Sequence, residues 1–188
     1  MVEIGHILPE PPSLAAHRVA NPGGSWDDFP TVPEKRDLKE QLFLEQEGLC
    51  IYCEAELSID DGHIEHIKSK GLNPPLTFIY NNLAHSCNAT NHCGHFKKRK
   101  VIPIEPRPAA NNDFALSSIT GELSPLIAIP ATAAENVDEA IFMLGLNNDP
   151  GLKRRRQQFA VTVQALATPG EIAVFLSTAP FRWSLRRI

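Results

Sequence analysis

All four cysteines and five of the seven histidines lie between Cys50 and His95. The cysteines form two pairs, Cys50-x2-Cys53 and Cys87-x5-Cys93. A C-x2-C knuckle places two thiolates on one edge of a tetrahedron, and a distant second pair can close the other edge, as in a structural zinc site without an open position. Buried free thiols are the alternative, and a redox C-x2-C is less favoured because no βαβ pattern surrounds the first pair. The spacing therefore predicts structural Zn²⁺ at these four residues.

Glu65 and His66 are adjacent between the two cysteine pairs. In a β-strand their side chains point to opposite faces, whereas in a bend they can converge on one group. A carboxylate that holds a hard cation beside an imidazole that accepts a proton from water is a pair suited to phosphodiester hydrolysis. His63 shares a strand face with Glu65 and is either a further ligand or an exposed strand histidine.

Three further features follow this pair. The amide of Asn82 can bridge two backbone segments of a loop that holds the histidine, and a helix bearing His95 can return a second cation ligand. A basic run then offers sequence-independent contacts to phosphate, although a solvated helix end is the alternative. The residues of this run are Lys97, Lys98, Arg99 and Lys100.

These segments, read as CIYCE, IEHIKSKG, YNNLAHSC and CGHFKKRK, resemble the HNH endonucleases. Their order is similar to that of the HNH subunits found beside an ATPase in Septu-type and retron-associated anti-phage defence. The match includes LFLEQEGLCIYCE upstream and FMLGLNNDPGLKRRRQQF downstream, so the resemblance extends over roughly residues 35–165.

The resemblance implies a role for each matching residue. His66 is the general base that activates water, Glu65 binds a catalytic Mg²⁺ or Mn²⁺, and Asn82 fixes the loop that orients His66. In the commoner pattern the final zinc pair is C-x2-C followed directly by Asn or His, whereas here it is C-x5-C followed by Gly94. We therefore expect His95 to be the second cation ligand, with Asn88 or Asn91 as alternatives. We expect His85 to be structural.

The implied activity is metal-dependent hydrolysis of nucleic acid, with DNA favoured over RNA, by an effector nuclease that works with an ATPase partner in prokaryotic defence. The alternative is a non-catalytic zinc-ribbon module that binds nucleic acid or protein. A stand-alone homing or restriction enzyme shares the chemistry but needs its own sequence-reading element, and the remaining residues contain no recognisable helix-turn-helix or recognition finger.

The elements that position these residues form an α+β fold. Residues 1–33 carry six prolines and predict an extended N-terminal arm. Residues 34–100 hold a helix over 34–47, which delivers the chain to Cys50, and the small zinc-stapled ββα-metal core that the resemblance implies. Residues 101–188 form a connector, with a β-like stretch at 114–123, and a mainly helical extension over 133–146 and 150–167. The tail at 171–183 is a helix or a strand.

Composition limits the partners and the compartment. The 188 residues are 43% hydrophobic, which is enough for a core, and the formal net charge is −4. Basic residues concentrate from residue 97 onward, at 97–100, 153–156 and 182–187, so we expect a polyanion to meet the second half. Because no apolar run has the length of a membrane span and the N-terminus lacks signal-peptide features, we expect a cytoplasmic protein without a membrane partner.

Overall fold

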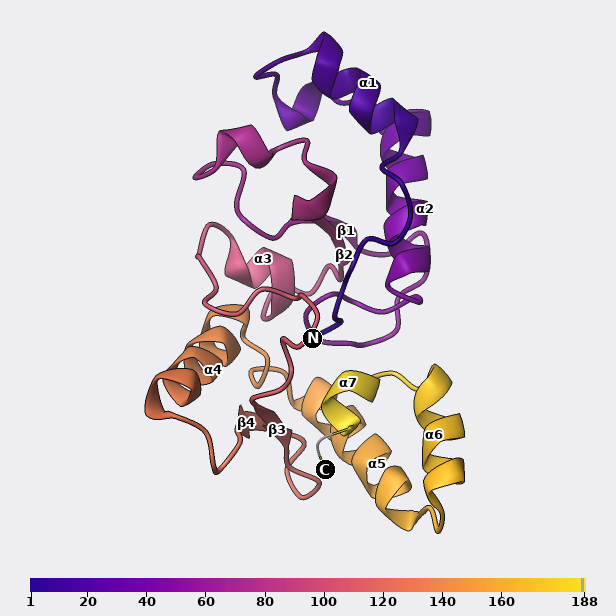
Figure 1. The fold of residues 1–188 in the computed structure, drawn as a ribbon, viewed down its shortest axis with the longest axis vertical. Helices are drawn as coiled ribbons and strands as arrows, with labels where there is room; N and C mark the ends of the chain where they lie inside the picture. Colours follow the sequence, from indigo (N-terminus) through magenta and orange to yellow (C-terminus); the bar gives the residue numbers. More distant parts are fainter. Residues whose placement is uncertain (187) are drawn as a thin grey trace.

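The candidate catalytic residues lie on a small two-stranded sheet that is followed by a helix. In the computed structural model, which describes residues 1–186 and 188, β1 (His63–His66) runs antiparallel to β2 (Leu83–Ser86), and α3 (Cys93–Lys97) follows (Figure 1). The register pairs Glu65 with Ala84 and His66 with Leu83. The predicted α+β class is confirmed, and the order of two strands and a helix is present.

One helix brings the chain to the first cysteine pair. α2 (Arg36–Glu45) buries Leu38 and Leu42 and leaves Arg36 and Asp37 exposed. Gly48 then adopts a φ of +71°, a left-handed conformation that glycine allows at low cost after a helix. The chain thereby turns into the loop that holds Cys50, so the helix predicted over 34–47 is confirmed.

The N-terminal arm contains regular structure, and the extended conformation predicted for all of residues 1–33 is wrong. α1 (Pro12–Ala20) forms there, and a helical turn covers Trp26–Asp28. Proline is favourable in the first turn of a helix because its missing N–H has no intrahelical partner there. The residues after Pro12 include several good helix formers, and Leu14 is buried by the packing of α1.

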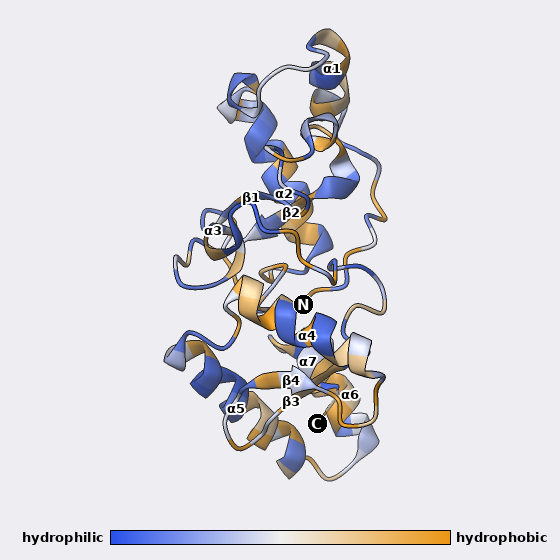
Figure 2. Ribbon diagram, turned by 90° about the vertical axis from the view of Figure 1, so that its left-hand side faces the viewer, coloured by the Kyte–Doolittle hydropathy of each residue, from blue (hydrophilic) through white to orange (hydrophobic). Residues whose placement is uncertain are grey.

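The described part of the C-terminal half contains a hairpin and four helices (Figure 1). The β-like stretch predicted at 114–123 forms the antiparallel pair β3 and β4, and the undecided tail is helical. Figure 2 shows hydrophilic and hydrophobic residues alternating along α4 and α5, as expected for helices with one buried face. The elements are β3 (Phe114–Leu116), β4 (Leu123–Pro125), α4 (Ala131–Leu144), α5 (Pro150–Ala165), α6 (Pro169–Thr178) and α7 (Arg182–Leu185).

Two hydrophobic clusters hold these elements together. The smaller cluster joins α1 and α2 to β2 through Leu14, Phe29, Leu42, Phe78 and Leu83. The larger cluster contains the loop around Cys50 and Cys53 together with buried side chains of α4, α5 and α7. The cysteine knuckle is thus packed into the same core as the C-terminal half.

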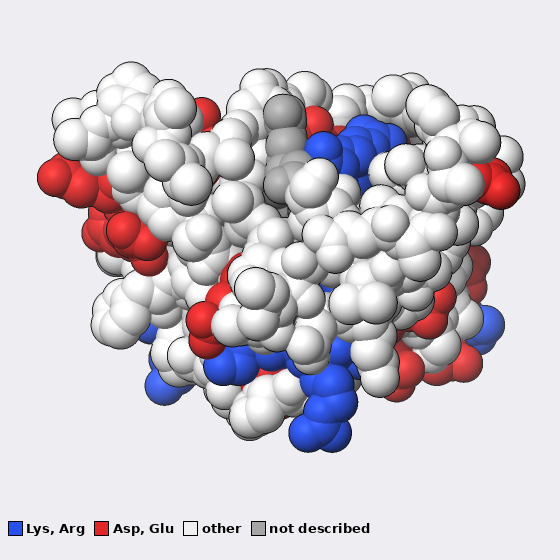
Figure 3. Space-filling view, turned by 90° about the horizontal axis from the view of Figure 1, so that it is seen from below, with Lys and Arg blue, Asp and Glu red and all other residues white. Residues whose placement is uncertain are grey.

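Among the described residues from 97 onward, positive charge does not form one continuous basic face. Arg156 is fully buried and donates to the carbonyl of Leu146 at 2.7 Å, and Arg182 is buried in an ion pair with Glu47. Figure 3, a view from below, shows Lys and Arg in separate groups on a mostly uncharged surface. Arg187, in the basic cluster at 182–187, lies outside the described residues. None of the helices in the described part of the chain is long and apolar enough to span a membrane.

Candidate active site and metal centre

The four cysteines converge from three separate segments. Cys50 and Cys53 follow α2, Cys87 follows β2, and Cys93 begins α3. Their sulfur atoms all lie within 4.8 Å of one another, and the Sγ atoms of Cys50 and Cys93 are 3.7 Å apart. A tetrahedral zinc ion with Zn–S bonds of about 2.3 Å requires S···S distances of roughly 3.8 Å, so the arrangement fits this ion. Among the described residues, these cysteines are the one set of three or more His, Cys, Asp or Glu residues that gathers closely enough to hold a metal ion.

The surroundings of the sulfur atoms also favour a bound cation. Burial raises the pKa of Cys50, but hydrogen bonds with the other three thiols outweigh this effect and hold its pKa well below the ordinary value. The pKa of Cys53 is raised well above the ordinary value by its hydrogen bond with Cys50, and that of Cys93 is raised mainly by burial. Ionisation of the remaining buried thiols therefore requires a compensating positive charge, which a metal ion supplies. The Cys87 N–H, 3.3 Å from the Cys50 sulfur, gives further support to a thiolate there.

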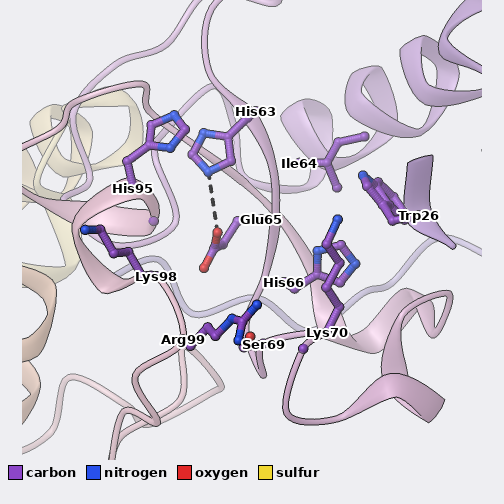
Figure 4. A pocket seen from close by; sticks show the side chains of 12 residues that line it. Trp26, His63, Ile64, Glu65, His66, Ser69, Lys70, His95, Lys98 and Arg99 are labelled. Atoms are coloured by element: carbon purple, nitrogen blue, oxygen red, sulfur yellow. Dashed lines mark hydrogen bonds and ion pairs between the residues drawn. The ribbon is translucent and has the colours of Figure 1, made fainter.

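Glu65 is a buried carboxylate with several partners. Its Oε1 atom lies 2.8 Å from Nζ of Lys97 and accepts a hydrogen bond from the Tyr52 hydroxyl at 3.2 Å. Its Oε2 atom lies 3.4 Å from Nε2 of His63 (Figure 4). Burial raises the pKa of Glu65, but the contact with His63 and the charge of Lys97 outweigh this and lower it overall. The side chain is therefore ionised, as a cation ligand must be.

Gly94 leaves room beside this carboxylate. A Cβ atom at residue 94 would lie 2.7 Å from Oε2 of Glu65 and 2.7 Å from Nε2 of His63, closer than real Cβ contacts. The position that carries Asn or His in the commoner motif is therefore open in this chain, and the His63 imidazole lies next to it. A carboxylate oxygen and an imidazole nitrogen facing this space form a donor set that fits a divalent cation.

His95 stacks on His63 at the edge of the cleft. Its ring stacks on that of His63, with the centroids 4.2 Å apart, and Oδ1 of Asn88 lies 3.3 Å from His63 Nδ1 and 3.4 Å from His95 Nε2. The contact between this histidine pair and Glu65 is made by His63. Asn91, the other alternative, donates to Asp149 at 3.1 Å and so connects the cysteine loop to the start of α5.

His66 lines the same cleft as Glu65 but is held by different contacts. Its Nε2 atom lies 3.0 Å from the carbonyl oxygen of Thr77, and because a carbonyl can only accept, Nε2 carries the proton and Nδ1 is left as an acceptor. The Trp26 ring packs edge-on against the imidazole at 4.7 Å between centroids. Burial lowers the pKa of His66 to about 4, so the ring is neutral at ordinary pH.

Asn82 bridges the loop between β1 and β2. Its Oδ1 atom accepts from the N–H of Lys68 at 2.8 Å, while its Nδ2 atom donates to the carbonyls of Lys68 at 2.9 Å and Leu76 at 3.1 Å. Thr77, whose carbonyl holds His66, is the next residue of this loop. Asn82 therefore has the contacts that a loop-fixing residue needs.

The basic run separates into three environments. Lys97, expected to contact phosphate, is instead fully buried, where it pairs with Glu65 and donates to the carbonyl of His66 at 3.1 Å. Lys98 and Arg99 line the cleft (Figure 4). Lys100 reaches α4, where its Nζ donates to the carbonyl of Met143 at 3.4 Å and lies 5.8 Å from the centre of the Phe142 ring.

Glu65, His66, Lys98 and Arg99 line a cleft of about 350 Å³. Besides Glu65 and His66 it is lined by His63 and His95 on one side and by Trp26 and Lys70 on the other (Figure 4). Sequence reasoning gave too little weight to His63 and did not single out Trp26 or Lys70. The two-residue spacing between His63 and Glu65, which puts both side chains on one face of a strand, is the sequence feature that points to His63. His85 lies apart from these groups, with Nε2 2.7 Å from the carbonyl of Asp61.

Comparison with known proteins identifies the family. No protein-family model matches the chain. Over 142 residues the chain is 37% identical to a Vibrio cholerae protein named "Retron Vc95 putative HNH endonuclease", and the match covers 71% of this chain and 67% of the relative. The chain belongs to the HNH endonucleases. An Escherichia coli protein named "Retron Ec83 putative HNH endonuclease" is 25% identical over 148 residues, which cover 60% of this chain and 57% of that relative.

The family membership confirms the resemblance seen in the sequence. This HNH endonuclease is an enzyme, and its substrate is nucleic acid. Its cleft brings together a buried carboxylate, a neutral histidine and basic side chains beside the cysteine cluster. Water activation and phosphate binding are the chemistry that this set of groups can perform.

Proposed function

We propose that this HNH endonuclease hydrolyses phosphodiester bonds of DNA with a divalent cation, Mg²⁺ or Mn²⁺, held by Glu65 and His63, and with His66 as the general base. His95 supports the cation site through its stacking on His63. The four cysteines hold a structural Zn²⁺. The observation that carries the proposal is the pairing of an ionised Glu65 with a neutral His66, whose Nε2 is occupied by the Thr77 carbonyl, in a single cleft.

The residues of the cleft divide the reaction among them. Nδ1 of His66 takes a proton from a water molecule, whose oxygen forms a bond to phosphorus as the bond to the leaving oxygen breaks, and the leaving oxygen takes up a proton from solvent. Lys98 and Arg99 hold the phosphate, and Asn82 keeps the Thr77 carbonyl in place behind His66. When bound, the cation supplies positive charge that stabilises the phosphate in the transition state.

The low pKa of His66 has a consequence for this role. A base with a pKa of about 4 is deprotonated at ordinary pH, so every molecule is ready to accept the proton. A base this weak gives little driving force for proton transfer, and a phosphate close to the ring would raise its pKa. The proposal therefore has His66 act as a base while substrate phosphate lies next to it.

The test compares the wild type with His66→Ala on supercoiled plasmid and on a structured RNA, with Mg²⁺, Mn²⁺ or EDTA. We expect cation-dependent cutting of DNA by the wild type and a loss of about 10²–10⁴-fold in the variant, the usual contribution of a general base. Zinc content should be the same in both proteins, and cleavage is compared where circular dichroism shows that both are folded, because the variant loses the hydrogen bond to the Thr77 carbonyl. Undiminished cutting by His66→Ala would overturn the assignment, and cutting of RNA alone would reverse the substrate preference.

Gly94→Ala tests the cation site in the same assay. The added Cβ would collide with both Glu65 and His63, so the Mg²⁺ concentration needed for half-maximal cutting should rise. Gly170→Ala, whose Cβ would have its nearest neighbour at 3.9 Å, is the matched control. Equal cation requirements in the two variants would exclude the space beside Gly94 as the cation site. Nucleic-acid binding without cutting by the wild type under any condition would favour a non-catalytic binding module.

We also propose that the enzyme works in the cytoplasm with an ATPase partner in prokaryotic anti-phage defence. The support is the order of sequence motifs and the retron names of the two relatives. Adding an ATPase of the same defence system should raise the cleavage rate, and an unchanged rate, with no complex in size-exclusion chromatography, would refute the partnership.

A further inference from the structure

Trp26 forms one wall of the catalytic cleft although it lies about 40 residues before the motif. The helical turn Trp26–Asp28 is capped by Ser25, and the indole packs on Phe29 and Phe78 with centroid distances of 5.5 and 5.7 Å. These contacts hold the indole against the His66 ring in a T-shaped arrangement. The indole is only partly buried, and its remaining surface lines the cleft.

Two lysines of like charge meet at this indole. Nζ of Lys35 lies 5.3 Å and Nζ of Lys70 lies 5.9 Å from the centre of the ring. In Figure 4 the Lys70 side chain reaches past the His66 ring toward Trp26. Burial lowers the pKa of Lys35, and the charge of Lys70 contributes to this shift. The charge of Asp27 opposes the lowering of the Lys35 pKa, and Asp27 also lies 4.0 Å from Lys70 with its side chain 89% exposed.

We propose that Trp26, Lys35 and Lys70 form a subsite for one unpaired nucleotide that flanks the scissile phosphate. The base stacks on the indole, and the two ammonium groups, on flexible stems, bind its phosphate. This inference rests on the proposed nuclease function and names the form of its substrate. An aromatic platform interleaved with cations is the chemistry that binds single strands without reading their sequence. In a duplex both faces of each base are covered by neighbouring bases, so the indole can stack only on a base that is unpaired or displaced.

The position of the subsite relative to His66 gives it a role in choosing where the strand is cut. Because the indole packs against the catalytic ring, a base on the indole belongs to a nucleotide at or next to the reacting phosphate. Lys98 lies at the other side of the cleft and Arg99 lies beside Ser69 and Gly71, so a strand held by Trp26 and Lys98 passes over Glu65 and His66. The enzyme thereby prefers single-stranded regions, flaps or loops over continuous duplex.

Tryptophan fluorescence tests the subsite without a change at Trp26. The chain has two tryptophans, so Trp183→Phe leaves Trp26 as the single emitter. This variant is titrated with three dye-labelled ligands: a single strand of about 12 nucleotides, the corresponding duplex, and a strand of abasic units. EDTA is present so that the strands are not cut. The anisotropy of the dye reports binding. We expect the single strand to quench Trp26 emission and the abasic strand to bind with no more than a small change. Equal quenching by the single strand and the abasic strand would overturn the proposal.

Affinity measurements supply an independent test. Trp26→Ala should weaken single-strand binding about tenfold, which corresponds to stacking of one base, and should change duplex binding less than about twofold. Trp26→Phe, which keeps an aromatic ring against Phe29 and Phe78, should lose part of the affinity without losing the fold. Lys70→Met should lower the slope of log affinity against log salt by about one, whereas Lys153→Met, in a pair with Glu122 on the C-terminal half, should not. Equal losses for single strand and duplex would refute the stacking role.

The binding and cleavage results separate the two proposals. Selective quenching by the single strand together with an absence of cutting would keep the subsite and remove the nuclease assignment. Cation-dependent cutting of duplex and single strand at equal rates, with no selective quenching, would keep the nuclease and remove the subsite.

Discussion

Replacement of Asn82 by alanine should weaken the fold and the catalytic site together. The side chain is 4% exposed and makes three hydrogen bonds, with lengths of 2.8, 2.9 and 3.1 Å, to the backbone of the loop between β1 and β2. A hydrogen bond within a protein contributes about 0.5–1.5 kcal/mol net, and a buried partner left without one adds to the loss. We therefore expect Asn82→Ala to lower the free energy of unfolding by about 2–4 kcal/mol.

The assay is urea unfolding followed by circular dichroism, with Asn81→Ala as the matched control. Asn81 is the neighbouring residue and is exposed, so its replacement should change stability by no more than about 0.5 kcal/mol. With a typical dependence of about 2 kcal/mol per molar urea, the Asn82→Ala midpoint should fall by about 1–2 M. Under conditions where both variants are folded and hold zinc, cleavage by Asn82→Ala should be slower by up to about 100-fold, because the Thr77 carbonyl no longer holds His66 in place.

Two outcomes would refute this reasoning. Equal urea midpoints for the two variants would mean that the three hydrogen bonds do not hold the loop. A large loss of stability with an unchanged cleavage rate would mean that the loop does not orient His66. Asn82→Asp adds a check, because its second oxygen would face the carbonyls of Lys68 and Leu76, so it should be no more stable than Asn82→Ala.

Two further predictions concern charge in the cleft. Lys97→Met leaves the Glu65 carboxylate buried without the ammonium group that pairs with it, so it should lower the free energy of unfolding by about 3–5 kcal/mol. Lys98→Met should leave stability unchanged and weaken nucleic-acid binding. Equal stabilities of the two variants in urea unfolding would contradict the ion pair. Burial lowers the pKa of His66 to about 4 in the folded chain, whereas the value in the unfolded chain is about 6.5. As the pH falls, the unfolded chain therefore binds the extra proton first. The contribution of His66 to the free energy of unfolding is complete above about pH 6.5 and is lost as the pH falls toward 4. The loss should be about 3 kcal/mol, measured as the difference in acid sensitivity between the wild type and His66→Gln, and parallel stability curves for the two proteins would argue against a buried neutral His66.

The features that sequence reasoning recovered depend on local spacing. The two cysteine pairs, the Glu65–His66 dipeptide and Asn82 lie within one short segment, and their residue types restrict the chemistry strongly. Helices such as α4 and α5 show the periodicity of one buried face, so their approximate bounds were visible in the sequence. The helix α1 was missed because the high proline content of residues 1–33 obscured the helix formers after Pro12.

The remaining features depend on tertiary contacts. Lys97 belongs to a run of four basic residues, and its burial follows from a partner, Glu65, on a different element. The sequence favours His95 over His63 as a cation ligand, and the fold shows that His63 contacts the carboxylate while His95 stacks on His63. Trp26 reaches the cleft because the α1–α2 cluster folds back over β2, which no local pattern reveals.

Because the cysteine knuckle packs against the C-terminal helices, the nuclease motif depends on these helices for its fold. The carboxylate of Glu54, the residue after Cys53, accepts hydrogen bonds from the N–H groups of Trp183 and Ser184 at 2.9 and 3.2 Å, so α7 completes the shell around the knuckle. A transplant of residues 34–100 alone would expose the apolar side of the knuckle and leave this carboxylate without those donors. A chimera that keeps the cleft intact must therefore carry the C-terminal helices with it.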